Sequence, residues 1–136
     1  MTVNAKLKLI DNNRFVARSG NSPAYVIDSA DGEGGVNPMQ MLLMSVAGCT
    51  AIDVIGILTK KRIKLSGFEV NIVGDEAEEH PQRYTKLNIE YVFYGSNIRS
   101  KALEQAIELS ETRYCCALAS LNAELESSYR VEAEMP

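Results

Sequence analysis

The sequence has little from which to build a metal centre or a disulfide framework. It contains one histidine, His80, and three cysteines, none of them paired as C-x-x-C. Metal cages usually combine several Cys and His residues at short spacing, so we expect no metal and no cofactor. An odd number of cysteines is also atypical of a secreted disulfide-bonded protein. We therefore expect a reducing compartment, the cytoplasm.

A surplus of positive charge, an export signal and internal repeats are also missing. Fourteen Lys and Arg against eighteen Asp and Glu give a net charge of −4, which excludes a nucleic acid as the expected partner. The first ten residues contain no basic segment followed by an apolar core and a cleavage site. With 136 residues, 46% of them hydrophobic, the chain is expected to form one soluble domain over residues 1–136.

Residues 41–58 form the one apolar run that approaches the length of a membrane span. Asp53 lies inside this run, and a carboxylate in the middle of a membrane costs about 2.5–3.5 kcal/mol on insertion scales. We therefore expect a buried helix of a soluble protein, with no membrane as a partner.

Alternating apolar residues bounded by turn residues predict the strands. The first three strands, at 3–10, 15–18 and 24–27, should form an antiparallel meander. The next two, at 68–72 and 87–93, should form a hairpin, and the last, at 129–133, should be an edge strand. Helical periodicity predicts three helices, at 38–62, 100–111 and 114–125. Asn37 is the expected N-cap of the first helix, with Gln40 as its capping-box partner. The fold class is α+β, with antiparallel strands packed against a long apolar helix.

The long helix has one stripe of small and polar side chains along an otherwise aliphatic surface. At 100° per residue this stripe contains Ser45, Cys49, Asp53, Gly56 and Lys60. It could line a cavity around Cys49, although a cysteine is also commonly a small buried hydrophobe. The Asp53 carboxylate, one turn further on, disfavours a thiolate by like-charge repulsion. A reactive Cys49 would therefore need a cation from elsewhere, such as Arg14 or Arg18, and Asp53 could hold that cation in place.

The other two cysteines, Cys115 and Cys116, are adjacent. On a helix they point about 100° apart, so only one of them should face a given partner. Spacing does not decide whether Cys115 or Cys116 meets Cys49. A thiol that is oxidised to a sulfenic acid and then captured by a second thiol is one use of such a pattern.

Two motifs resemble the OsmC/Ohr family, the osmotically induced and organic hydroperoxide resistance proteins. The first motif occupies residues 34–62, from Gly34-Gly35-Val36-Asn37-Pro38 through Ala47-Gly48-Cys49-Thr50 to Lys60-Lys61-Arg62. The second is Tyr114-Cys115 followed by Ala117-Leu118-Ala119. The resemblance covers nearly the whole chain from about Phe15.

This resemblance implies an OsmC-like fold in which antiparallel sheets wrap the long central helices of an intertwined homodimer. It further implies that Cys49 is the nucleophile that attacks an organic hydroperoxide and that Cys115 is the resolving thiol. A dithiol would then reduce the resulting disulfide. Arg14 and Arg18 correspond loosely to the activating arginine, with Gln40 and Asp53 as supporting residues, and the role of Cys116 stays open.

Two functions follow from this pattern. The first is cysteine-based reduction of organic hydroperoxides, with apolar peroxides preferred because Met and Leu surround the stripe. The alternative is an OsmC-like, stress-related dimer that binds a small apolar ligand without efficient peroxidase turnover. It is motivated by Met39 and Gln40, which stand where active peroxidases of the family usually carry a glutamate.

Overall fold

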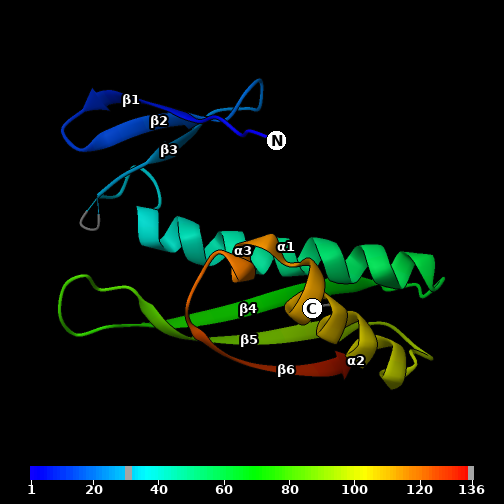
Figure 1. Cartoon of the computed structure of the whole chain (residues 1–136). Coiled ribbons are helices and arrows are strands. Elements are labelled where there is room, and N and C mark those ends of the chain that lie inside the picture. Colours follow the sequence, from blue (N-terminus) through cyan, green and yellow to red (C-terminus); the bar gives the residue numbers. More distant parts are fainter. Residues whose placement is uncertain (30–31, 135–136) are drawn as a thin grey trace. The chain divides into compact units, whose positions relative to one another are not determined.

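The computed structural model describes residues 1–29 and 32–134 of the chain (Figure 1). The chain divides into two compact units, Met1–Leu42 and Leu43–Pro136, and each unit is described by itself. The long helix α1 (Pro38–Lys60) begins in the first unit and continues into the second.

The first unit contains a three-stranded antiparallel sheet in the order β1-β2-β3, as the alternation predicts. Its strands are β1 (Lys6–Asp11), β2 (Arg14–Arg18) and β3 (Tyr25–Ile27). A tight turn joins β1 to β2, with Asn12 at a φ of 44°, a conformation that Asn tolerates better than most residues. The chain leaving β3 is held by Asp28, whose backbone N–H donates to the carbonyl of Val36 at 3.0 Å.

Helix α1 begins with the predicted capping box. The backbone N–H of Gln40 donates to Oδ1 of Asn37 at 2.8 Å, and the backbone N–H of Asn37 donates to Oε1 of Gln40 at 3.0 Å. These two bonds satisfy donors that a helix start leaves without intrahelical partners. The helix ends at Lys60, two residues before the predicted end, because Arg62 turns into the left-handed region at a φ of 59°.

The second unit contains a sheet in the order β4-β5-β6, formed by β4 (Gly67–Glu76), β5 (Tyr84–Tyr94) and β6 (Glu124–Glu132). Strands β4 and β5 form the predicted antiparallel hairpin. Strand β6, however, pairs with β5 in parallel, from Lys86 opposite Glu124 to Tyr94 opposite Glu132. The sheet is therefore mixed, and the expectation of antiparallel strands throughout is wrong for β6.

The segment between β5 and β6 is only partly helical. Helix α2 (Ser100–Leu109) is followed by a π-helical turn, η1 (Ser110–Tyr114), and by the four-residue helix α3 (Cys116–Ala119). The predicted helix over 114–125 is wrong beyond Ala119, and β6 starts at Glu124 rather than at 129. Pairing with β5 overrides the helical preference of the Ala- and Leu-containing stretch before it.

The core of the second unit lies around β5, whose residues Leu87, Ile89, Tyr91 and Phe93 are fully buried. Helix α1 contributes one residue per turn to the buried interior: Val46, Thr50, Val54 and Leu58. Helix α2 buries Ala102, Leu103, Ala106 and Ile107, and the buried Ser110 follows it. The two helices meet where the Ser110 hydroxyl donates to the carbonyl of Thr50 at 3.5 Å.

The remaining surface of α1 is apolar and largely exposed within this chain. Ile52 has 75% of its surface exposed, and Met44 and Ile55 are also exposed. By length and composition alone α1 could cross a membrane, since its most apolar 18-residue window has a mean hydropathy of 2.1, but core helices of soluble proteins pass the same test. Only 22% of that window is buried inside the chain, and the rest of its residues are partly or fully exposed within it.

Candidate functional site

Three side chains that can ionise come together in the second unit. The sulfurs of Cys49 and Cys115 and a carboxylate oxygen of Asp53 all lie within 4.8 Å of one another. Cys49 and Asp53 are four residues apart on α1, which places them on the same face of the helix. The stripe predicted from the sequence is therefore the surface that Cys115 approaches.

The π-helical turn positions Cys115. At its end the backbone N–H of Cys115 donates to the carbonyl of Ser110, five residues earlier, at 2.8 Å. The chain then becomes extended, with φ −70° and ψ 101° at Cys115, before α3 begins. The sulfur of Cys115 caps α3 by accepting the backbone N–H of Leu118 at 3.4 Å. Such π-helical turns are frequent at functional sites, because they redirect side chains that a regular helix would place elsewhere.

Cys116 faces away from this cluster. Its side chain is exposed, and its thiol lies 3.6 Å from the carbonyl oxygen of Tyr114. Cys115, in contrast, is only 5% exposed. The structure thus distinguishes two adjacent cysteines that spacing alone could not, and Cys115 is the one beside Cys49.

A buried hydroxyl holds the Asp53 carboxylate. Ser110 is fully buried, and its Oγ donates to Oδ2 of Asp53 at 3.0 Å as well as to the carbonyl of Thr50. Ser110 is the first residue of η1, directly after α2. Its contact with Asp53 depends on how α1 and α2 pack, which a helical pattern does not reveal.

A second polar pair, Tyr91 with Glu111, lies near Cys115. The hydroxyl of Tyr91 donates to Oε2 of Glu111 at 2.7 Å, and Ser127 donates to Oε1 of the same carboxylate at 3.0 Å. Burial, and then the bond to Glu111, raise the pKa of Tyr91, so it stays a hydrogen-bond donor at neutral pH. No pattern in the sequence indicates that Tyr91, on β5, and Glu111, in η1, would pair.

The surroundings keep Cys115 protonated at neutral pH. Burial is the largest cause, and the neighbouring Cys49 adds to it, while the N–H of Leu118 opposes both. Together they raise the pKa of the Cys115 thiol to about 11. A buried thiolate lacks solvation by water, which accounts for the direction of the shift.

A groove of about 510 Å³ adjoins Asp53 in the second unit. Its wall is mostly apolar and includes two lysines, Lys60 at the end of α1 and Lys61 directly after it. The residues that line the groove are Ile52, Asp53, Gly56, Ile57, Lys60, Lys61, Leu109 and Tyr114. Ligand sites are typically concave and mainly apolar with a few placed polar groups, and this groove has that character.

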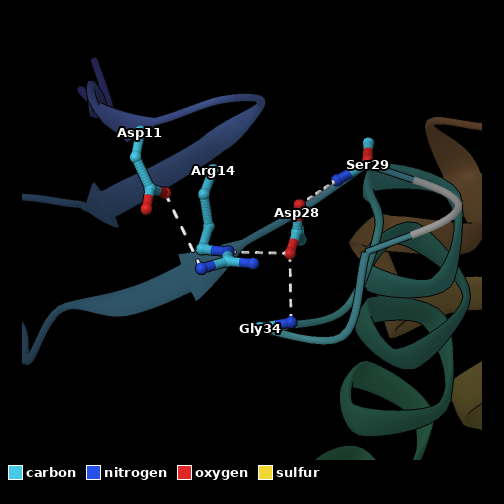
Figure 2. Close-up of polar contacts among 5 residues, drawn as sticks. All are labelled: Asp11, Arg14, Asp28, Ser29 and Gly34. Atoms are coloured by element: carbon cyan, nitrogen blue, oxygen red, sulfur yellow. Dashed lines mark hydrogen bonds and ion pairs between the residues drawn. The ribbon is translucent and has the colours of Figure 1, made fainter.

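A separate polar cluster lies in the first unit and contains Arg14 (Figure 2). The Arg14 Nε donates to Oδ2 of Asp28 at 3.0 Å, and its Nη1 forms an ion pair with Asp11 at 3.7 Å. The backbone N–H groups of Ser29 and Gly34 also donate to Asp28, at 2.7 and 3.0 Å. The hydrogen bond from the N–H of Ser29 is the largest cause that lowers the pKa of the Asp28 carboxyl below its usual value. The hydrogen bond from Arg14 is the next largest cause that lowers it.

Gly34 lets the backbone approach the guanidinium of Arg14 closely. A Cβ atom at position 34 would lie 2.8 Å from Cδ of Arg14 and closer still to its Nε, so Arg14 would have to shift to admit a side chain there. The sequence analysis did not identify Asp28 as a partner of Arg14. The one sequence feature that points to Asp28 is its position as an acidic residue directly after a predicted strand.

The other predicted supporting residues have different surroundings. Gln40 is engaged in the capping box of α1. Arg18 lies at the end of β2 and lines a cavity of about 370 Å³ in the first unit, together with Lys6 and Lys8. Within the described residues, the predicted nucleophile, Cys49, the predicted resolving thiol, Cys115, and Asp53 are brought together.

A family model and a curated relative both match most of the chain. The family model described as OsmC-like protein matches residues 30–130. Protein YhfA of Escherichia coli (strain K12) is 30% identical over 131 residues, which cover 95% of this chain and 98% of YhfA.

Solved structures share the fold. A hypothetical protein from Aquifex aeolicus VF5 is 33% identical, with 99% of both chains covered and a TM-score of 0.88. The organic hydroperoxide resistance protein OhrB of Bacillus subtilis has a TM-score of 0.62 at 12% identity, with 96% of this chain and 98% of that chain covered.

Proposed function

The chain belongs to the OsmC-like protein family, and on that premise we propose that its clustered thiols reduce organic hydroperoxides. The observation that supports this function is the approach of the Cys49 and Cys115 sulfurs to within 4.8 Å. Two thiols at this separation can form a disulfide after a small movement, since an S–S bond is about 2.05 Å long.

The proposed reaction has three steps. The Cys49 thiolate attacks the terminal oxygen and the O–O bond breaks, which forms a sulfenic acid on Cys49, while the departing alkoxide takes a proton from solvent and leaves as the alcohol. The Cys115 sulfur then attacks that sulfenic sulfur, so that a disulfide forms and water leaves. A dithiol reductant finally exchanges with the disulfide, becomes oxidised itself, and returns both cysteines to thiols.

Burial supports this assignment of roles. Cys49 is half-buried and can be reached by a substrate, whereas Cys115 is buried and protonated at neutral pH. A nucleophile has to ionise before it attacks, and a raised pKa makes Cys115 the poorer first nucleophile. Its proton is required when the sulfenic oxygen leaves as water.

The groove beside Asp53 favours an apolar substrate. Its lining includes Ile52, Ile57 and Leu109, which water solvates poorly. We therefore expect organic hydroperoxides to react faster than hydrogen peroxide, because only the former gain from burying an apolar group.

We propose that the active form is a homodimer. The exposed residues of α1, among them Ile52 and Ile55, form an apolar surface of the kind that marks a protein interface. Three unbridged thiols in the described structure fit a reducing compartment, and we propose the cytoplasm. Sedimentation velocity on the reduced protein tests the dimer, and a monomer at micromolar concentration would contradict it.

A peroxidase assay with matched cysteine variants tests the function. Wild-type protein is mixed with an alkyl hydroperoxide and a dithiol, and alcohol formation is followed. We expect no turnover in Cys49→Ser. In Cys115→Ser we expect one alcohol per chain and then arrest, because the sulfenic acid is not resolved. Cys116→Ser, altered at an exposed thiol outside the cluster, is the control and should turn over like the wild type.

The same assay distinguishes the alternative function, binding of a small apolar ligand without turnover. The specific observation that favours this alternative is the 510 Å³ apolar groove, which needs no redox chemistry to be occupied. Turnover that is absent in the wild type, together with saturable binding of an apolar fluorescent probe, would support the alternative. Turnover that persists in Cys49→Ser would refute the assignment of the nucleophile.

A further inference from the structure

The thiol cluster has the composition of a zinc site as well as that of a redox pair. Cys49 and Cys115 supply two sulfurs and Asp53 one oxygen, all within 4.8 Å. Spacing predicted no metal cage because the sequence contains no C-x-x-C and a single histidine. The third ligand is instead an aspartate one helical turn from Cys49, and the second sulfur comes from 66 residues away.

The distances are close to those a zinc ion requires. With Zn–S bonds of about 2.3 Å in a tetrahedron, two sulfur ligands lie about 3.8 Å apart. A sulfur and an oxygen ligand lie about 3.5 Å apart in the same geometry, and the observed separations are at most 4.8 Å, so a contraction of about 1.3 Å or less brings the three atoms into range. Side-chain rotation of Cys49 and Asp53, both only half-buried, can supply such a shift.

Groups around the cluster already orient the ligands. Ser110 donates to one oxygen of Asp53 at 3.0 Å and so holds the carboxylate in place. The N–H of Leu118 donates to the sulfur of Cys115 at 3.4 Å, and such a bond also stabilises a metal-bound thiolate. Hydrogen bonds of this kind to ligand atoms are typical of metal sites in proteins.

We propose that reduced Cys49, Asp53 and Cys115 bind one Zn²⁺ ion per chain, with water at the fourth position. Thiolates favour zinc over hard cations such as Mg²⁺ and Ca²⁺. Binding releases the two thiol protons to solvent and changes no oxidation state, so no oxidant or reductant takes part. Two thiolates and one carboxylate leave the complex with a charge of −1.

Zinc and the disulfide exclude each other in this site. Each requires both sulfurs, and a sulfur in a disulfide has no thiolate charge for the metal. The occupied site is therefore a reduced, peroxide-protected state. Zinc binding goes beyond the proposed peroxidase activity and does not rest on it, because the three ligands and their geometry are the same whether or not the protein turns over peroxide.

A competition titration tests the proposal. Fully reduced, metal-free protein is titrated with Zn²⁺ against a chromophoric chelator, and Co²⁺ is added separately to reveal sulfur-to-metal charge transfer. We expect one zinc per chain and a charge-transfer band in the wild type and in Cys116→Ser, whose altered thiol is exposed. Cys49→Ser and Cys115→Ser should lose tight binding, and Asp53→Asn should weaken it. Ser110→Ala should weaken it by about 10–100-fold, the range for a group that orients a ligand.

Oxidation provides a test without any substitution. Protein treated with a thiol oxidant until two thiols are lost should bind no zinc, and reduction should restore one site per chain. Failure of the reduced wild type to compete with the chelator would overturn the proposal. So would wild-type affinity in Cys49→Ser, Cys115→Ser or Asp53→Asn, or loss of binding in Cys116→Ser. None of these readouts depends on peroxide turnover, so a failure of zinc binding and a failure of the peroxidase are distinguishable.

Discussion

Oxidation of Cys49 and Cys115 should stabilise the protein, and the structure sets the size of the effect. A disulfide between them closes a loop of about 66 residues, which lowers the entropy of the unfolded chain by an amount worth about 4 kcal/mol at 25 °C. For 136 residues the entropy of unfolding corresponds to about 3.5 °C in Tm per kcal/mol. The upper limit of the increase is therefore about 15 °C.

Part of this gain is offset by distortion. The two sulfurs have to move from a separation of up to 4.8 Å to bonding distance, and Cys115 has to adjust inside a packed environment. We therefore expect an increase in Tm of about 5–15 °C on oxidation.

Differential scanning calorimetry on reduced and oxidised protein measures this difference, and a thiol assay under denaturing conditions counts the cysteines. The count should fall from three to one, and the increase in Tm should persist in Cys116→Ser and vanish in Cys115→Ser. A Tm that is unchanged or lower after an intramolecular loss of two thiols would refute the reasoning. So would an oxidised product linked between chains through Cys116.

Three further predictions follow from the described contacts. Ser110→Ala should lower the free energy of unfolding by about 1–3 kcal/mol in urea denaturation, because the half-buried Asp53 carboxylate and the Thr50 carbonyl lose their donor; an unchanged free energy of unfolding would contradict this. The pKa of Cys115 is raised from 9.0 to about 11 on folding, so the reduced protein should lose stability as the pH rises from 9 to 11, and Cys115→Ser should flatten that dependence. Arg14 and Arg18 are both candidates for the cation that favours the Cys49 thiolate, so under the proposed function Arg14→Gln or Arg18→Gln should slow the reaction with peroxide about tenfold in a stopped-flow assay, equivalent to about 1.4 kcal/mol. Wild-type rates in both variants would contradict a role for either arginine.

Local signals in the sequence predicted much of the fold. Asn37 and Gln40 form the expected capping box, because both bonds join atoms three residues apart and need no tertiary contact. The hairpin of β4 and β5 follows from alternation and a polar connection. The parallel pairing of β6 was not predictable in this way, since alternation has the same period in parallel and antiparallel strands.

The candidate site was predictable only in part. The stripe with Cys49 and Asp53 follows from the helical period alone, and the role of Cys115 followed from the resemblance to the family. The contact of Ser110 with Asp53 depends on packing between segments distant in sequence. The contacts of Asp28 depend on the close approach of Gly34 to the guanidinium of Arg14. The π-helical turn inserts an extra residue into the helical register, which no helical periodicity in the sequence anticipates.

The rotation of α1 about its axis links the core, the thiol cluster and the exposed apolar surface. Val46 and the buried residues at intervals of four after it fix one face of the helix against the core. Once that face is fixed, the 100° step between residues determines where Cys49 and Ile52 point. A residue inserted directly after Cys49 would rotate the Cys49 side chain by about 100° relative to the buried Thr50, Val54 and Leu58, and would separate it from Cys115 without altering either cysteine. The redox and metal-binding proposals for the thiol pair therefore both depend on the register of this helix, as well as on the chemistry of its ligands.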